Sequence, residues 1–352
     1  MRILIATDAW HPQVNGVVRT YSRLVKEIEK LGGVVEIITP SQFFTMPCPT
    51  YPEIQLALLG TGAVAKRVEA FRPHFIHIAT EGPIGLMTRA YCRKAGHTFT
   101  TSYHTRFPEY VAARFPIPES WCYAIQRKFH NGGSGMMVAT LSLEQELQKK
   151  GFNNILHWSR GVDTEQFHPR PIRLFGNEPV FLYVGRVAVE KNIEAFLQAK
   201  LPGQKVVVGG GPQLSDLRTI YPDIQFTGPK TGEELAQHYA SADVFVFPSL
   251  TDTFGIVIIE ALASGLPIAA FPVTGPKDIV IEGKTGVLDD DLSQAAIGAL
   301  ELESDVCYEA AQVYNWQNSA QQFIYNIQNM SSESCESLVK SSSKNESNNN
   351  RH

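Results

Sequence analysis

Residues 244–265 read VFVFPSLTDTFGIVIIEALASG and contain one complete strand-to-helix unit. Four apolar residues, Val244–Phe247, suit a buried strand because the run is bounded by Pro248 and is too short for a helix. A polar loop follows, and an almost wholly apolar helix is expected to begin near Gly255. A strand that passes through a short loop into a helix is the repeating unit of a parallel α/β sheet.

The same unit recurs on both sides of this stretch. In the second half, further strands are expected at Val180–Gly185, Lys205–Val208, Ile224–Phe226 and Ile268–Ala270, with helices starting near Lys191, Pro212 and Thr231. In the first half, strands are expected at Ile3–Thr7, Val34–Thr39, Phe75–Ala79, Thr98–Tyr103 and Met136–Thr140. Helical patterns separate them at Val17–Leu31, Gly62–Phe71, Pro83–Ala95, Glu119–Phe129 and Ser142–Lys150. Strands that alternate with helices of this length predict parallel, doubly wound sheets.

The length of 352 residues favours two domains, because one hydrophobic core rarely grows so large. A stretch rich in proline and glycine, from His168 to Pro179, is typical of a linker. We therefore expect an N-terminal Rossmann-like domain over residues 1–168 and a C-terminal one over residues 169–330. The last helix, from Trp316 to about Met330, could return to the N-terminal domain. Residues 331–352 are polar, with few apolar side chains to bury, and are expected to form a disordered tail.

Composition narrows the functional class. The chain is 43% hydrophobic and 19% charged, as in soluble globular proteins, and has no apolar run of the roughly 20 residues that cross a bilayer. The apolar N-terminal segment is too short for a secretory signal, and the five cysteines show no close pairing, so a cytoplasmic protein without disulfides or zinc is expected.

The charge is unevenly distributed along the chain. Residues 1–170 hold 19 Lys+Arg and 13 Asp+Glu, a balance of +6, and the remaining 12 and 22 give −10. A basic first half suggests an anionic partner such as a membrane surface, although scattered solvated cations would explain it equally well. The excess is too small for a nucleic-acid-binding protein.

Three segments of the second half carry chemistry suited to a phosphorylated ligand. Arg186 and Lys191 follow Gly185 at the end of a strand. The planar guanidinium of Arg186 and the compact ammonium group of Lys191 would together suit a diphosphate. Gly209-Gly210-Gly211 follows the next strand and allows either close backbone approach to a ligand or tight packing. Its spacing is not that of a dinucleotide fingerprint, which argues against a dehydrogenase.

The third segment is the quoted one. The amide groups of Phe254, Gly255 and Ile256 open its helix and suit sugar or phosphate oxygens. Glu260 lies among apolar residues of that helix, where a carboxylate needs partners, and ribose hydroxyls could supply them.

Together these segments resemble the glycosyltransferases of family 4, which are retaining enzymes of the GT-B fold with two Rossmann-like domains facing across a cleft. The family signature, an acidic residue and a glutamate with seven residues between them, matches Asp252 and Glu260. Further matching segments are Gly185-Arg186 with Lys191, Gly211-Pro212, Phe226-Thr227-Gly228, Arg160-Gly161-Val162-Asp163 and Gly283-Lys284-Thr285-Gly286.

The resemblance implies roles for individual residues. Arg186 and Lys191 would stabilise the donor diphosphate, Glu260 would hold the ribose, and Asp252 with the Phe254-Gly255-Ile256 backbone would hold the sugar. Catalytic roles are thus expected for Arg186, Lys191, His104 and Asp252. Donor contacts are expected from Gly16, Arg160, Gly185, Gly210, Phe254, Gly255, Ile256 and Glu260. Many relatives carry Glu where Asp252 stands, so the sugar is less firmly implied than the reaction. His77 is interpreted as structural.

No cofactor or metal is expected, because the nucleotide-sugar is a substrate and the resembling fold needs no bound cation. Asp289-Asp290-Asp291 looks like a metal motif of another glycosyltransferase fold, but Asp291 or Ser293 is better placed to cap a following helix over Gln294–Leu302.

Several alternatives stay open. A nucleotide-sugar epimerase or a catalytically silent nucleotide-sugar-binding protein could share these phosphate contacts. The donor could be a UDP- or a GDP-sugar, with mannosyl- or glucosyl-type transfer, and the acceptor a lipid or a glycan. A basic set in the first half could seat the protein on the inner face of an anionic membrane: Arg89, Arg93, Lys94, Arg114, Arg127 and Lys128.

Overall fold

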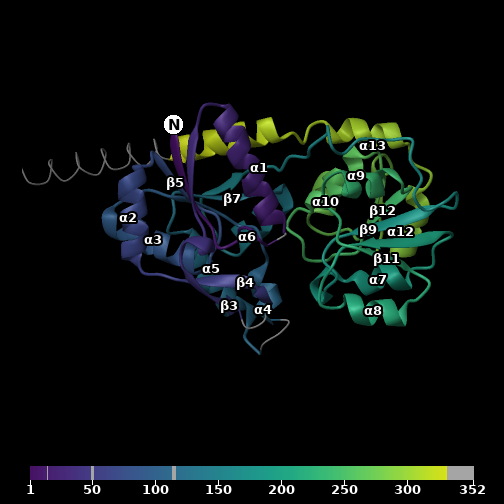
Figure 1. The fold of residues 1–352 in the computed structure, drawn as a ribbon, viewed down its shortest axis with the longest axis horizontal. Helices are drawn as coiled ribbons and strands as arrows, with labels where there is room; N and C mark the ends of the chain where they lie inside the picture. The colour runs from purple at the N-terminus through teal and green to yellow at the C-terminus, as the bar shows by residue number, and fades with distance from the viewer. Residues whose placement is uncertain (14, 49–50, 113–115, 331–352) are drawn as a thin grey trace, which may run out of the picture. The chain divides into compact units, whose positions relative to one another are not determined.

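A computed structural model describes residues 1–13, 15–48, 51–112 and 116–330 (Figure 1). The chain forms two compact units. The first unit contains Met1–Ala139, Glu144–Ser159 and the segment from Gln317, and the second contains Thr140–Leu143 and Arg160–Trp316. Each unit has its own parallel sheet with helices on it, so the prediction of two Rossmann-like α/β domains is confirmed.

The first unit is built on a six-stranded parallel sheet. Its strands are β1 (Arg2–Ala6), β2 (Val34–Ile38), β5 (Phe75–Ile78), β6 (Thr100–Ser102), β7 (Gly135–Val138) and β8 (Ile155–His157), in the order β2-β1-β5-β6-β7-β8. Ile3, Leu4 and Ile5 of the inner strand β1 are fully buried, which explains why this run has no helical period.

Helices cover this sheet, and a small hairpin stands apart from it. The helices are α1 (Gly16–Lys30), α2 (Thr61–Phe71), α3 (Pro83–Ala95), α4 (Phe107–Ala112), α5 (Glu119–His130), α6 (Leu141–Lys149) and the helix over residues 316–330. The antiparallel pair β3 (Phe44–Cys48) and β4 (Tyr51–Leu58), which the sequence analysis did not predict, forms a separate two-stranded sheet.

The second unit repeats the parallel sheet. Its strands are β9 (Val180–Val184), β10 (Gln204–Val208), β11 (Gln225–Gly228), β12 (Val244–Phe247), β13 (Ile268–Ala270) and β14 (Gly286–Leu288), in the order β11-β10-β9-β12-β13-β14. Its helices are the short 3₁₀ turn η2 (Val189–Lys191), α7 (Ile193–Gln198), α8 (Leu214–Ile220), α9 (Gly232–Ala240), α10 (Ile256–Ala263), α11 (Pro276–Ile279), α12 (Leu292–Ala299) and α13 (Ser304–Ala311). Phe181, Val207 and Val246 are fully buried in the core of this unit.

The boundary between the units differs from the expected one after residue 168. Arg160–His168 belongs to the second unit, where the amide of Val162 donates to the carbonyl of Tyr314 at 2.8 Å. The expected linker is also held there, because Arg170 pairs with Glu233 and Arg173 pairs with Asp243. The segment rich in proline and glycine is thus a fixed connection that packs on the second unit.

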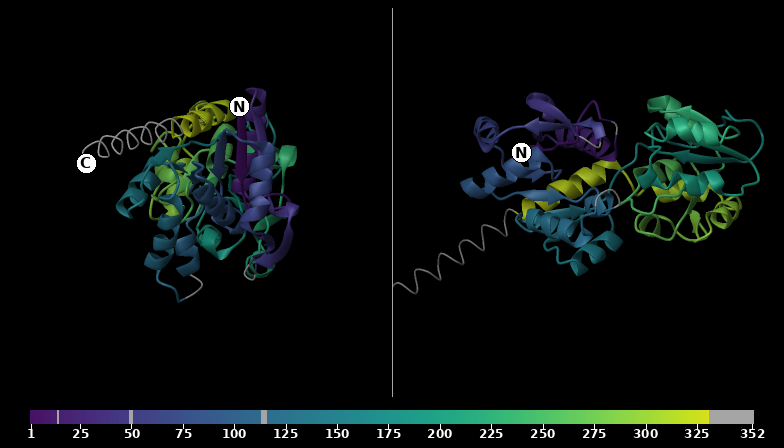
Figure 2. Two further views of the ribbon diagram at one scale, coloured as in Figure 1. Left: turned by 90° about the vertical axis from the view of Figure 1, so that its left-hand side faces the viewer. Right: turned by 90° about the horizontal axis from the view of Figure 1, so that it is seen from below.

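The helix over residues 316–330 belongs to the first unit from Gln317 onward. The indole of Trp158 donates to the carbonyl of Ser319 at 3.0 Å, and Phe323 packs edge-on to His77. Figure 2 shows this yellow helix against the purple and blue elements of the first unit. No helix within the described ranges is both long enough and apolar enough to cross a membrane.

Candidate active site

The strand order of the second sheet reverses between β9 and β12. The chain runs outward from β9 to β10 and β11, then returns to add β12, β13 and β14 on the other side of β9. Loops diverge at such a switch point and leave a crevice beyond the carboxyl ends of the strands. The loops that follow β9 and β12, together with α10, carry most of the expected donor-site residues.

The loops after β9 and β10 are packed backbone against backbone. The amide of Gly185 donates to the carbonyl of Val208 at 3.0 Å, and the amide of Val187 donates to the carbonyl of Gly210 at 2.9 Å. Gly209 has φ of +150°, and a Cβ there would lie 1.8 Å from the carbonyl oxygen of Gly185. A Cβ on Gly210 would have Pro229 as its nearest neighbour, at 3.7 Å. Tight packing therefore explains Gly209, whereas Gly210 leaves room for a ligand.

The turn after β9 is joined to the loop after β12 at three points. The Nζ of Lys191 lies 2.5 Å from Oδ1 of Asp252, and both side chains are about one-quarter or less exposed, at 24% and 20%. The side-chain amide of Asn192 donates to the carbonyl of Pro248 at 3.0 Å, and the hydroxyl of Thr251 donates to the carbonyl of Glu190 at 3.3 Å. Oδ2 of Asp252 is buried and has no hydrogen-bond partner among the described residues. Two predicted catalytic residues thus form one ion pair at the switch point.

Arg186 lies on the same edge and is half-buried. Its backbone carbonyl accepts a hydrogen bond from the buried hydroxyl of Tyr183 at 2.8 Å. Burial, with the nearby charges of Asp252 and Glu190, raises the pKa of Tyr183 well above its ordinary value. Tyr183 is therefore a neutral donor that fixes the loop from which the Arg186 side chain extends.

The helix α10 begins in the expected place. Gly255 has φ of +90° at the N-cap of α10, and within the described ranges no side chain caps this helix end. Phe254 is buried edge-on to Tyr314, whereas Ile256 is half-buried. A Cβ on Gly275 would lie 2.8 Å from the carbonyl of Phe254, so the loop after β13 also closes on this edge.

Glu260 has a protein partner that the sequence analysis did not foresee. The carboxylate is 2% exposed and accepts a hydrogen bond from the hydroxyl of Tyr239 at 3.0 Å. One of the contacts expected from ribose is therefore supplied by α9. Arg160 is likewise buried in the second unit.

Two expected site residues, Gly16 and His104, lie in the first unit. Gly16 is the first residue of α1, and the side chain of Asn15 caps this helix by accepting from the amides of Val17 and Val18. His104 follows β6 and is half-buried, with its Nε2 3.0 Å from the hydroxyl of Tyr21.

A buried chain of polar groups leads to His104, and sequence reasoning missed it. The Tyr21 hydroxyl lies 2.8 Å from Nε2 of His77 and 3.1 Å from the hydroxyl of Ser102. Nδ1 of His77 lies in turn 2.8 Å from the hydroxyl of Thr100. His77 is a core residue, as predicted, but it is also two hydrogen bonds away from the expected catalytic histidine.

The acidic run at Asp289–Asp291 serves local structure. The carboxylate of Asp291 accepts from the amide of Ser293 at 2.9 Å and caps α12, as predicted, although α12 is Leu292–Ala299. The carboxylate of Asp289 accepts from the amide of Asp291 at 2.8 Å. Within the described part of the chain, no three His, Cys, Asp or Glu side chains are grouped to hold a metal ion.

Comparison with known proteins decides the family. Residues 14–166 match the model of "Glycosyltransferase Family 4", and residues 178–305 match that of "Glycosyl transferases group 1". The GDP-mannose-dependent alpha-mannosyltransferase of Corynebacterium glutamicum is 30% identical over 319 residues, which cover 82% of this chain and 77% of that protein. The chain belongs to glycosyltransferase family 4.

Two further relatives align with this glycosyltransferase. Sulfoquinovosyl transferase SQD2 of Arabidopsis thaliana is 31% identical over 78% of the chain, which spans 61% of SQD2. Alpha-monoglucosyldiacylglycerol synthase of Streptococcus pneumoniae is 26% identical over 87% of the chain and 80% of its own length. Among solved structures, sucrose-phosphate synthase from Thermosynechococcus elongatus superposes with a TM-score of 0.77 at 20% identity, covering 94% of this chain and 99% of that one. The fold of the glycosyltransferase is therefore GT-B.

Proposed function

We propose that this glycosyltransferase moves a hexose from a UDP- or GDP-sugar to a lipid or glycan acceptor with retention of configuration. The observation that carries the proposal is the Lys191–Asp252 pair at the switch point of the second sheet, beside Arg186 and the uncrowded Gly210. A diphosphate needs cations and accessible backbone there, and a sugar needs a carboxylate that accepts from hydroxyl groups.

The Lys191–Asp252 pair suggests how the donor would be recognised. The diphosphate would draw Lys191 toward its own oxygens, and Arg186 would bind it as a planar fork. Asp252, whose Oδ2 is buried without a partner in the described part of the chain, would then accept from hydroxyls of the transferred sugar. Charge that develops on the departing diphosphate is stabilised by cations already in place, which is an efficient form of catalysis. No metal is needed for this step.

The other predicted residues complete the donor site. Glu260, oriented by Tyr239, would accept from ribose hydroxyls, and the amides at Phe254, Gly255 and Ile256 would bind sugar or phosphate oxygens. Gly185 and Gly210 would let the backbone approach the donor, with Arg160 in support. Gly16 and His104 of the first unit would contact the transferred sugar.

For the acceptor, we favour a lipid at the inner face of a membrane over a soluble glycan. The relative from S. pneumoniae is named for synthesis of a glucosyldiacylglycerol, and the first half of this chain is basic. Not all six basic residues are available for head groups. Arg89 donates to the carbonyl of Lys128 at 2.7 Å and Arg127 to that of Lys150 at 2.9 Å, while Arg114 lies outside the described residues. Arg93, Lys94 and Lys128 remain exposed.

Thermal unfolding with a panel of UDP- and GDP-sugars tests the donor. One class should raise the unfolding midpoint selectively in the presence of EDTA, because a ligand that binds the folded state stabilises it. Incubation with that donor and a diacylglycerol acceptor should release the nucleoside diphosphate. A new nucleotide-sugar made from donor alone would indicate an epimerase, and stabilisation without turnover a silent binding protein. The proposal fails if no nucleotide-sugar stabilises the chain.

A further inference from the structure

The outer face of α5 is unusually apolar for a surface helix. Trp121 and Ile125 are 68% and 70% exposed, and Lys128 is exposed on the same face, since residues four and seven positions apart share one side of a helix. Ile117, just before α5, and Phe107 of the neighbouring α4 add further exposed apolar area. Large apolar side chains exposed on one helix and near it commonly mark a binding surface.

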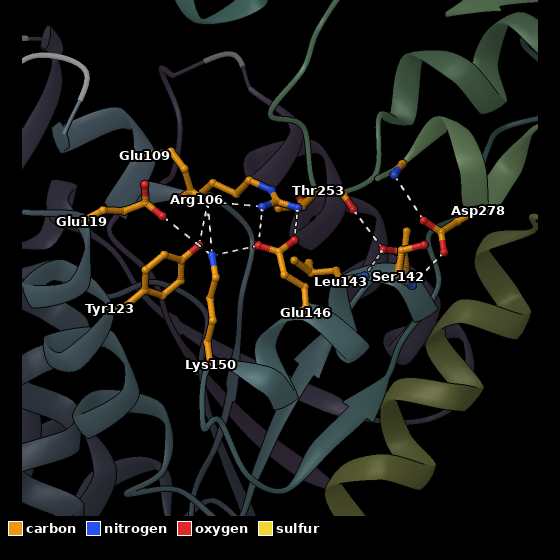
Figure 3. A network of polar contacts seen from close by, with 12 residues as sticks. Arg106, Glu109, Glu119, Tyr123, Ser142, Leu143, Glu146, Lys150, Thr253 and Asp278 are labelled. Atoms are coloured by element: carbon orange, nitrogen blue, oxygen red, sulfur yellow. Dashed lines mark hydrogen bonds and ion pairs between the residues drawn. The ribbon is translucent and has the colours of Figure 1, made fainter. Parts of the chain in front are cut away.

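The inner face of α5 is fixed by a network of charges (Figure 3). The hydroxyl of Tyr123 donates to Glu109 at 2.6 Å, and the Nζ of Lys150 lies 3.7 Å from the centre of the Tyr123 ring. Arg106 forms a two-pronged contact with Glu146 at 2.9 and 2.7 Å. Although burial alone would raise the pKa of Glu146, hydrogen bonds and charges from Arg106 and Lys150 lower it below its ordinary value. The ionised network therefore holds α5 against α4 and α6 in one orientation.

Cations border the apolar face at the C-terminal end of α5. Arg89 of α3 donates to the carbonyls of Lys128 and Phe129 at 2.7 and 3.0 Å, so α3 approaches the last turn of α5. Arg93 and Lys94 lie in the last turn of α3 and are exposed. Among the described residues, neither they nor Lys128 has an ion-pair partner. Tryptophan and aliphatic residues flanked by lysine and arginine are characteristic of helices that lie in a membrane interface.

We propose that α5 is the face on which this glycosyltransferase docks to an anionic membrane. Trp121 and Ile125 enter the head-group boundary, while Lys128, with Arg93 and Lys94, binds the anionic head groups. This inference rests on the lipid-acceptor part of the proposed function. Charge favours lipid over a second copy of the chain, because a twofold contact through this face would bring the same cations together.

Vesicle flotation tests the surface with a matched pair of variants. Wild type should float with vesicles of about equal parts phosphatidylglycerol and phosphatidylcholine, and Trp121→Ser should bind them about tenfold more weakly. Tyr325→Ser is the control, since Tyr325 is an aromatic residue on another helix of the same unit and is 64% exposed. This variant should float like wild type. Flotation of Trp121→Ser equal to wild type, or equal losses in both variants, would overturn the proposal.

Two further readouts separate this inference from the proposed function. Lys128→Glu should also fail to float with the vesicles. If wild type instead forms a dimer and does not float, and Trp121→Ser abolishes the dimer, the face binds a second copy of the chain. That result would overturn membrane docking. Donor stabilisation is measured on the same variants without vesicles and should be unchanged. If a nucleotide-sugar stabilises wild type but wild type does not float, the docking face is refuted and the donor site is kept. If wild type floats but no nucleotide-sugar stabilises it, the donor site is refuted and the docking face is kept.

Discussion

Both units have a six-stranded parallel sheet, but the sheets differ in strand order and in what occupies their switch points. In the first sheet, the order reverses between β1 and β5. Asp8 follows β1, and its carboxylate accepts from the amides of Ile84 and Gly85 at 2.9 and 3.3 Å and from the hydroxyl of Thr80 at 2.9 Å. The N-terminus of α3 is thus capped by the unit's own anion. In the second sheet, α10 follows β12 in the corresponding position, and no side chain of the described residues accepts from the amides that open this helix.

This difference supports the proposal that a phosphorylated donor binds the second unit. A helix N-terminus favours an anion, and at α3 that anion is already Asp8. Burial raises the pKa of Asp8 above its ordinary value, although hydrogen bonds from Ile84, Thr80 and Gly85 oppose the shift. The second unit instead carries Arg186 and Lys191 after β9, in a segment whose Val187 amide donates to the carbonyl of the uncrowded Gly210. The first unit has the half-buried His104, which is hydrogen-bonded to a buried chain of hydroxyl groups through Tyr21 and Ser102.

Removal of the cation at the second switch point should have the largest effect. Lys191→Ala should lower kcat/KM about a thousandfold, because a preorganised charge on the leaving group is lost, while the fold is retained. Lys200→Ala, which removes an exposed lysine of the same unit, is the control and should leave kcat/KM unchanged. Steady-state kinetics and thermal unfolding measure the two properties.

The same prediction extends to the partner of Lys191. Because the two side chains form one ion pair, the losses in Lys191→Ala and Asp252→Asn should not add in the double variant. Near-normal turnover in Lys191→Ala would contradict the role given to the second switch point.

Adjacent glycines in the second unit should separate packing from ligand access. Gly209→Ala should lower the free energy of unfolding by about 3 kcal/mol, since the new Cβ would meet the carbonyl of Gly185 at 1.8 Å. Gly210→Ala should unfold like wild type, because its Cβ has ordinary contacts, yet it should weaken donor binding. Urea unfolding and titration of the donor class found by thermal shift distinguish the two. Full donor affinity in Gly210→Ala would show that this loop serves packing alone.

The sequence predicts the buried strands well because short apolar runs between glycine or proline residues have few other structures available. Val244–Phe247 and Ile268–Ala270 are found with the expected bounds. The hairpin β3–β4 was missed because its strand Phe44–Cys48 is mostly exposed and contains Pro47, so it has neither the burial nor the composition of a core strand. β8 is only partly buried and sits at the sheet edge, which leaves a weak signal.

The candidate site also has one part that the sequence predicts and one part that it does not. Glycines and cations directly after strands are local signals, and they located Gly185, Arg186, Lys191 and Gly210. Pairings across the fold have no local signal. Lys191 and Asp252 are 61 residues apart, and Tyr21 is 56 residues from His77 and 83 from His104. Tyr21 lies on the buried face of α1 and His77 within β5, so in the sequence both are indistinguishable from core residues.

The smallest effect should come from the polar chain of the first unit. The hydroxyl of Tyr21 contacts His77, Ser102 and His104. Because it has one proton, it donates to one of these groups and accepts from the others. Loss of the hydroxyl would leave the ring of His104 less firmly oriented. Tyr21→Phe should therefore lower kcat about tenfold with little change in donor affinity, as for a positioning residue.

A tyrosine that does not belong to this set of hydrogen-bonded polar groups provides the control for stability. Tyr123→Phe removes the hydrogen bond of another buried hydroxyl of the first unit, to Glu109, and should cost a similar free energy of unfolding, about 1–3 kcal/mol, without changing kcat. Equal kcat values in the two variants would mean that the hydrogen-bonded groups around Tyr21 only stabilise the core of the first unit. A selective loss of kcat in Tyr21→Phe would support the proposal that Tyr21 positions His104 for the transfer.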